Sequence, residues 1–163
     1  MQDVANTPGF ALTRFLCGKT RAWGIVEDRF GRIQRKFSLE MHGHWQGDVF
    51  HLDESFRFDD GEEDSRTWLV TPGKNGRFTA TCGDCVGHAE GQASGDTISM
   101  SYRFRIMVGG RAFVVGFDDR IFRMDENLAI NRATMRKWGI KVGELSAVFM
   151  RDRQACAQTS AAA

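Results

Sequence analysis

The sequence predicts an all-β fold: a closed antiparallel up-and-down β-barrel of about 8–10 strands with one or two short helical turns. Three observations predict it. Apolar and polar residues alternate with a period of two over long segments, turn residues separate these segments at short intervals, and 163 residues suffice for one core. A two-sheet sandwich is the alternative architecture.

Ten segments carry the alternation. In chain order, the expected strands are Lys19–Glu27, Arg32–His42, Phe50–Phe58, Ser65–Thr71, Gly76–Cys82, Val86–Ala93, Ile98–Ile106, Arg111–Met124, Leu128–Thr134 and Ile140–Arg151. Gly, Asn and Asp lie between them, and these residues tolerate the positive φ angles of hairpin turns. Neighbours in sequence should therefore pair, and closure of the meander removes its exposed edges.

Two segments do not fit the alternation. Thr7–Leu16, with Thr7 as N-cap and Pro8 after it, and Thr134–Trp138, ended by Gly139, are each expected to form about one helical turn. We divide the chain into a lead-in at residues 1–14, one barrel domain at 15–151 and a disordered tail at 152–163.

The composition restricts location and partners. With 22 Lys and Arg against 21 Asp and Glu, no overall field attracts nucleic acid. No segment is long and apolar enough for a transmembrane helix, and the start does not resemble a secretory signal. As given, the chain is expected in the cytoplasm with reduced thiols, or in the periplasm or anchored to a membrane if a leader has been removed.

Four charged residues fall on apolar faces of the expected strands. Arg21 shares a face with Trp23, and Arg35, Glu54 and Arg132 lie among apolar residues of their own strands. An unpaired charge in an interior costs several kcal/mol, more than the roughly 2 kcal/mol gained by burying one Phe. These groups must therefore pair, reach the end of the barrel or meet a ligand.

Two interpretations follow. In the first, an amphipathic acid lies with its head on Arg21 or Arg132, because a guanidinium matches a carboxylate, and its tail contacts Phe37, Phe56, Phe58 and Phe104. In the second, which is the commoner role of inward charges, Glu54 pairs with an arginine and Trp23 lies under a guanidinium, as a plug at one end.

No metal, cofactor or catalytic motif is predicted. Cys82, Cys85 and His88 have ligand spacing, but a structural zinc site needs four ligands. His42 and His44, which lead into Trp45, are more typical of a solvated strand end than of a ligand pair, and together with His51 on the next strand they form the alternative metal site.

The adjacent carboxylates Asp118 and Asp119 should point to opposite faces of a strand, and we expect a bulge there rather than an acid–base pair. Nucleophile-elbow, phosphate-loop and dinucleotide motifs are missing, so enzymatic catalysis has no specific support.

Several segments together resemble the bacterial domain-of-unknown-function family 3833. They are Gly18–Gly24, Asp28–Gly31, Asp59–Glu62, Val108–Arg111, Phe117–Asp119 and Ile130–Met135, continued by Lys137, Gly139 and Val142–Glu144. The resemblance implies a lipocalin-like or calycin-like barrel, relatives that include lipoproteins, and a link to fatty-acid modification. It adds Asp118, Asp119 and Asn131 to the candidate ligand-binding residues Arg21, Trp23, Arg35, Glu54 and Arg132.

The resemblance also implies that Trp23 pairs with an arginine of a late strand to close the base of the barrel. Three functions remain open: a carrier of a fatty-acid-like molecule, a structural or interaction module whose own side chains fill the barrel, and, third, an enzyme acting on lipids through Asp118 or Asp119 and Arg132.

Overall fold

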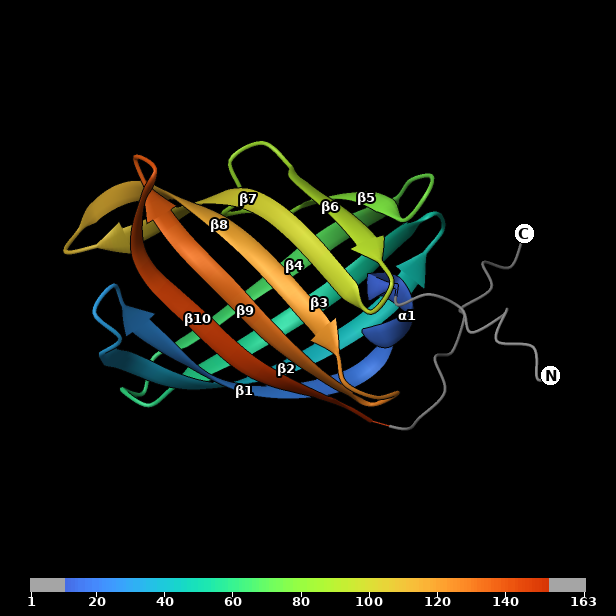
Figure 1. Ribbon diagram of the computed structural model, residues 1–163, viewed down its shortest axis with the longest axis horizontal. Helices are drawn as coiled ribbons and strands as arrows, with labels where there is room; N and C mark the ends of the chain where they lie inside the picture. Colours follow the sequence, from blue (N-terminus) through green and yellow to red (C-terminus); the bar gives the residue numbers. More distant parts are fainter. Residues whose placement is uncertain (1–10, 153–163) are drawn as a thin grey trace.

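The computed structural model describes residues 11–152. Figure 1 shows a barrel with a short helix, α1, inside one end. The elements are α1 (Leu12–Phe15), β1 (Gly18–Asp28), β2 (Ile33–Gln46), β3 (Val49–Phe58), β4 (Glu63–Pro72), β5 (Arg77–Thr81), β6 (Ala89–Ser94), β7 (Thr97–Val108), β8 (Arg111–Arg123), β9 (Leu128–Lys137) and β10 (Ile140–Arg151).

The strands form a closed barrel in sequence order, and β1 pairs with β10 to complete it. Every neighbouring pair is antiparallel, for example Thr20 opposite Met41 and Leu52 opposite Trp68. The predicted closed up-and-down barrel is confirmed, and the sandwich alternative is wrong. Closure gives each strand two neighbours, so no long edge is left unpaired.

Strands β5 and β6 are short, and the connection between them completes the wall of the barrel. Cys85 forms an isolated bridge with Phe104 of β7. The Val86 N–H donates to the Arg103 carbonyl, and the Arg105 N–H donates to the Asp84 carbonyl. This connection therefore takes over the backbone pairing of β7 beyond the end of β6.

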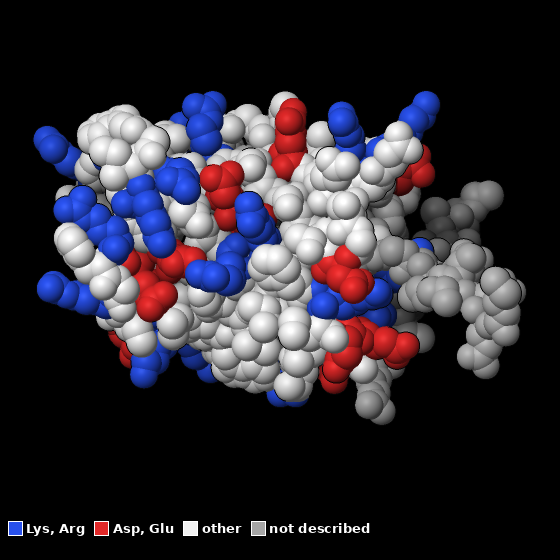
Figure 2. Space-filling model, viewed as in Figure 1, with Lys and Arg blue, Asp and Glu red and all other residues white. Residues whose placement is uncertain are grey.

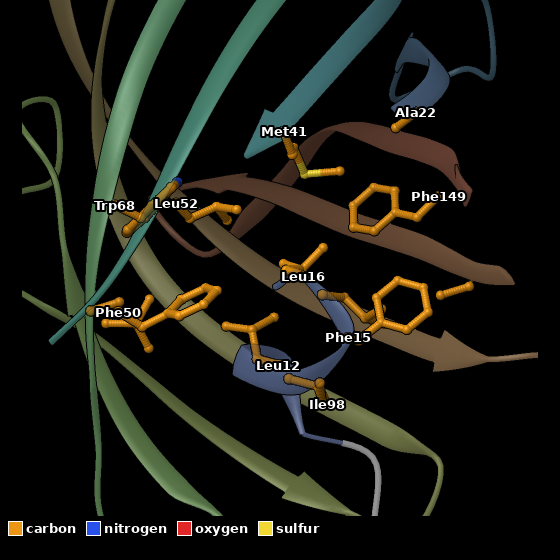
Figure 3. Close-up of a cluster of buried hydrophobic side chains, with 14 of the residues drawn as sticks. Leu12, Phe15, Leu16, Ala22, Met41, Phe50, Leu52, Trp68, Ile98 and Phe149 are labelled. Carbon is orange, nitrogen blue, oxygen red and sulfur yellow. The ribbon is translucent and has the colours of Figure 1, made fainter. Parts of the chain in front are cut away.

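The end of the barrel that contains α1 is filled by apolar side chains. Leu12, Phe15 and Leu16 are buried against Phe50 and Phe149 from the strands, as Figure 3 shows. Phe50 is fully buried, and burying a side chain of this size stabilises the fold by roughly 2–3 kcal/mol. The helix is thus a plug that belongs to the core.

A glycine makes room for this plug. A Cβ at Gly43 of β2 would lie 2.0 Å from the carbonyl oxygen of Leu16 and 2.4 Å from Cζ of Phe50. Only a residue without a side chain lets the chain after α1 approach the wall so closely.

Two predictions of local structure were wrong. The expected helical turn at Thr134–Trp138 is the end of β9, because residues up to Lys137 pair with β10. Trp138 and Gly139 both have positive φ (52° and 77°), as a tight two-residue hairpin requires. The expected bulge at Asp118–Asp119 is a regular part of both ladders; bulges occur instead at Val26/Glu27 and Lys141/Gly143.

The first expected helical turn is present in part, since α1 lies within Thr7–Leu16 and its N-cap is Ala11. Thr7, Pro8 and residues 1–10 of the lead-in lie outside the described residues, as do residues 153–163 of the expected tail. Among the described residues, no helix has the length and apolar character needed to cross a membrane.

Candidate ligand-binding site

The half of the barrel away from α1 differs from the plugged half. Several of its inward-facing side chains are only half-buried, among them Val26, Phe58, Ile106, Phe117 and Leu145, whereas Phe104 and Val115 are buried. These half-buried side chains are partly accessible to solvent, whereas the side chains around α1 are almost completely covered. Charged and polar groups lie at the junction of the two halves.

Glu54 of β3 and Arg66 of β4 are register partners on adjacent strands, and both side chains point into this interior. Their side chains are 13% and 18% exposed, and Arg66 Nε lies 3.8 Å from Glu54 Oε2. Trp68 also donates a hydrogen bond to Glu54. Burial raises the pKa of Glu54 to about 7, the Arg66 charge opposes the shift, and the Asp119 carboxylate adds to it.

A second carboxyl is held by a buried hydrogen-bond network. Asp119 of β8 accepts from the Tyr102 hydroxyl at 2.6 Å and from the Asn131 amide at 3.0 Å. Burial raises the pKa of Asp119, although both hydrogen bonds oppose the shift. Burial and the neighbouring Asp119 charge raise the pKa of Tyr102 well above its usual range. Burial thus opposes ionisation of both carboxyls, and for Glu54 it brings the pKa close to neutral.

Aromatic rings surround these groups. Tyr102 stacks on Phe117 with ring centroids 5.1 Å apart, and Trp68 stacks on Phe104 at 5.4 Å. The Arg66 guanidinium lies 4.9 Å from the ring centres of both Phe56 and Phe104. This arrangement offers an apolar wall interrupted by a few directed polar groups, as small-molecule sites commonly do.

Arg35 of β2 lies nearer the open end. Its guanidinium is 3.6 Å from the Phe58 ring centre and pairs with Asp60 at 2.9 Å and Glu62 at 2.8 Å. The side chain is 31% exposed, so these pairs contribute little to stability. Like Arg66, it has a buried Nε without a hydrogen-bond partner among the described residues.

The structure places four candidate site residues on the outer face. Arg21, Trp23 and Arg132 were expected inside, whereas the outward position of Asp118 agrees with the expectation that Asp118 and Asp119 point to opposite faces. Arg21 and Trp23 are exposed and contact each other, with the guanidinium 5.7 Å from the indole centre. Arg132 pairs with Glu144, and Asp118 accepts a hydrogen bond from Ser101. Arg132 and Asp118 line a polar concavity of about 600 Å³ on the outside of β7–β10.

Small inward-facing residues in β1 and β9 explain why the orientations of Arg21, Trp23 and Arg132 were predicted wrongly. The interior sides of these strands carry Thr20, Ala22 and Gly24, and Ala129, Asn131 and Ala133. A Cβ at Gly24 would lie 2.4 Å from Cζ of Phe37, so large side chains from other strands occupy this space. In β1 and β9 the alternate residues with the larger side chains therefore face outward. The end of the barrel is closed by α1 and not by Trp23.

The remaining predictions of orientation agree with the structure. Arg35, Glu54, Asp119 and Asn131 point inward, and the last three contribute to the polar cluster. Sequence reasoning missed Arg66 and Tyr102. Arg66 shares its parity with Trp68 and Val70, so the alternation within β4 could have identified it.

Among residues 11–152, Cys82, Cys85 and His88 are not brought together into a group of three possible metal ligands. Cys82 and Cys85 are free thiols whose pKa is raised by burial, and His88 lies 3.4 Å from Glu90. Cys17 is disulfide-bonded, so the expectation of reduced thiols is wrong for this residue.

Comparison with known proteins places this geometry in a family. The sequence profile of DUF3833, a family of proteins of unknown function, matches residues 1–151. The chain belongs to the DUF3833 family. The resemblance seen in the sequence is thereby confirmed. No curated protein gives a significant match to this family member.

Two solved structures share the fold of this DUF3833 chain. The S-type phycobiliprotein lyase CPES from Guillardia theta superposes with a TM-score of 0.64 at 9% identity, covering 90% of this chain and 95% of the lyase. A protein of unknown function from the DUF3598 family of Nostoc punctiforme gives 0.61 at 14% identity, covering 91% of this chain and 53% of that protein. At such identities the likeness concerns the fold alone.

Proposed function

We propose that this DUF3833 chain is a lipocalin-like binder of a fatty-acid-like molecule, which lies in the half of the barrel away from α1. The observation that supports this proposal is the incomplete covering of several inward-facing aromatic side chains on the side away from α1, namely Phe56, Phe58, Tyr102 and Phe117. A barrel filled by its own side chains, the alternative function, would leave these groups as covered as those around α1.

The polar cluster supports an acidic head group. Arg66 Nε is buried without a hydrogen-bond partner among the described residues, and Glu54 lies at 3.8 Å rather than at hydrogen-bonding distance. A buried donor without a partner is costly, and a ligand oxygen would satisfy it. The acid would therefore bind Arg66, and its chain would extend past Phe56 and Phe58 toward the open end. Arg66 replaces Arg21 and Arg132, which lie outside.

Replacing Arg66 by Gln should remove the preference for an acid over an alcohol. We expect wild-type protein to bind oleate about tenfold more tightly than oleyl alcohol, because one charged hydrogen bond contributes roughly 1.5 kcal/mol. Arg66→Gln should bring the two affinities together. Displacement of a fluorescent apolar dye measures both ligands, and Arg21→Gln, a change on the outer face, is the matched control.

Two results would contradict the proposal. The first is an equal loss of oleate binding in Arg21→Gln and Arg66→Gln. The second is a protein that, purified from its own host and measured by native mass spectrometry, carries no small molecule and also binds neither oleate nor oleyl alcohol. The second result would favour the interaction module with a filled barrel.

A further inference from the structure

The end of the barrel opposite α1 carries an unusual set of exposed apolar side chains. They lie on three hairpins, β1–β2, β9–β10 and β7–β8, which follow one another around the rim. The side chains are Phe30 and Ile33, Trp138 and Ile140, and Met107 and Val108. Trp138 is 87% exposed, Phe30 68% and Met107 66%, far more than single apolar residues on a strand face such as Val148.

The same three hairpins are basic. They carry Arg29 and Arg32, Lys137 and Lys141, and Arg105 and Arg111, against the acidic residues Asp28 in the β1–β2 turn and Glu144, which pairs with Lys141. Arg29, Arg32, Arg105 and Arg111 are exposed, and none of them forms a salt bridge with any residue between 11 and 152. Figure 2 shows Lys and Arg side chains gathered at this end, on the left of the view. We call these three hairpins the basic rim.

The charge is local to this arc. The next hairpin at the same end, β3–β4, carries Asp59, Asp60 and Glu62 instead. The whole chain has a formal net charge of only +1, so the rim is a patch within a balanced surface. A patch of one sign attracts an oppositely charged surface over about one Debye length.

Each ring at the tips is accompanied by a cation. Lys137 Nζ lies 4.5 Å from the centre of Trp138, and the guanidinium groups of Arg29 and Arg32 lie 4.6 Å and 5.7 Å from the centre of Phe30. Separate apolar tips with adjacent cations suit the boundary of a bilayer, where rings enter the acyl region and cations remain among the head groups. A protein partner would be better matched by one continuous apolar patch.

We propose that the basic rim docks on a bilayer containing anionic lipids. The docking itself does not rest on the proposed function; only the identity of the transferred molecule does, and the half-buried inward side chains lie toward this same end. Docked in this way, the chain would present the open end of the barrel to the lipid surface, and a molecule with an acyl chain could enter without crossing water.

Vesicle co-sedimentation tests the docking. We expect binding to vesicles of phosphatidylcholine with phosphatidylglycerol, no binding to phosphatidylcholine alone, and release as salt is raised well above about 0.1 M. The double variant Phe30→Ser, Trp138→Ser should lose about tenfold in affinity, and so should Arg105→Glu, Arg111→Glu. The control Val148→Ser, Met150→Ser changes exposed apolar residues of β10 and should bind normally.

Each result separates the two proposals. Arg66→Gln should dock normally, so loss of oleate preference with intact docking concerns the interior alone. Absence of binding to anionic vesicles by the full chain, or binding that neither rim variant reduces, would overturn the docking. Tryptophan emission that does not shift to shorter wavelength on adding anionic vesicles would also contradict it, because Trp138 is the most exposed large apolar residue.

A separate observation concerns the outer face of β2 and β3. The register sets His42 opposite Asp53 and His44 opposite His51. His42, His44 and Asp53 each offer one ligand atom, and these atoms lie within 4.8 Å of one another. Nδ1 of His44 is buried, has no hydrogen-bond partner among the described residues and lies 3.8 Å from Asp53 Oδ2. His51 stacks on His44 at 5.5 Å and limits its rotation.

We infer that these three residues bind a divalent transition metal such as Zn²⁺, with water in the remaining positions. Imidazole and carboxylate are both zinc ligands at about 2.0–2.2 Å, so the three atoms need to approach by roughly 1 Å. The sequence suggested His42, His44 and His51 as a possible metal cluster but not Asp53, because Asp53 reaches the site only through the strand register.

Calorimetric titration with Zn²⁺ tests the inference. One equivalent should bind, and His44→Gln or Asp53→Asn should each weaken binding at least about tenfold. His88→Gln, which changes a histidine paired with Glu90 outside the cluster, is the control. No binding by the wild-type chain, or equal binding by wild type and His44→Gln, would overturn the site.

Discussion

Replacing Glu54 by Gln is expected to raise the free energy of unfolding at pH 8 by about 3 kcal/mol and to leave it nearly unchanged at pH 4. The folded protein keeps the Glu54 proton up to about pH 7, whereas the ordinary carboxyl pKa is 4.5. The folded state thus binds more protons than the unfolded state between these values. The stabilisation that protonated Glu54 contributes is fully present below about pH 4.5 and is lost as the pH rises to about 7. Above that pH the free energy of unfolding no longer changes through this group.

Denaturant unfolding at several pH values measures the effect. Asp119 has a pKa shifted in the same direction, but it is present in both proteins, so the difference between wild type and Glu54→Gln isolates Glu54. Asp118→Asn is the control, because this carboxyl lies outside and is 58% exposed. A difference between Glu54→Gln and wild type that is the same at pH 4 and pH 8 would show that Glu54 is not held in a desolvated site.

Gly43→Ala is expected to destabilise the fold by about 3 kcal/mol and to lower the melting temperature by roughly 10 °C. The new Cβ would lie 2.0 Å from a backbone carbonyl oxygen, that of Leu16, which cannot turn aside as a flexible side chain could. Relief requires the chain after α1 to move away from β2, and the plug would lose contact with Phe50.

Gly116→Ala is the matched control. Gly116 also lies within a strand, but a Cβ there would meet only the Arg136 carbonyl oxygen at 3.6 Å, an ordinary contact. Thermal unfolding of both variants separates crowding from the general effect of changing a strand glycine. Equal melting temperatures for the two variants would mean that α1 does not press against Gly43.

The fold was predictable because its signals are local. Period-two alternation, as in the strand containing Phe37, Leu39 and Met41, requires only one buried face, and hairpin turns require only glycine or a short polar residue with positive φ. The segment before Trp138 was misread because a short run gives no clear period, and pairing with β10 decided its conformation.

The candidate site was predictable only in part. Glu54 and Asp119 alternate in their strands with large apolar residues that share the same face, so the alternation predicts that both point inward. Arg21 and Arg132 were misplaced because their strands carry apolar residues on both parities. Which parity faces inward then depends on the space left by other strands, as the approach of Phe37 to Gly24 shows.

The sequence by itself determined the number and order of the strands, the antiparallel closure and the family, since these depend on local periodicity, turn chemistry and motif order. Only the tertiary structure decided that α1 plugs one end, that Arg66 meets Glu54, and that three basic hairpins form one rim. These features depend on strand register and on the volumes of side chains from distant segments, and neither is encoded in any single stretch of the chain.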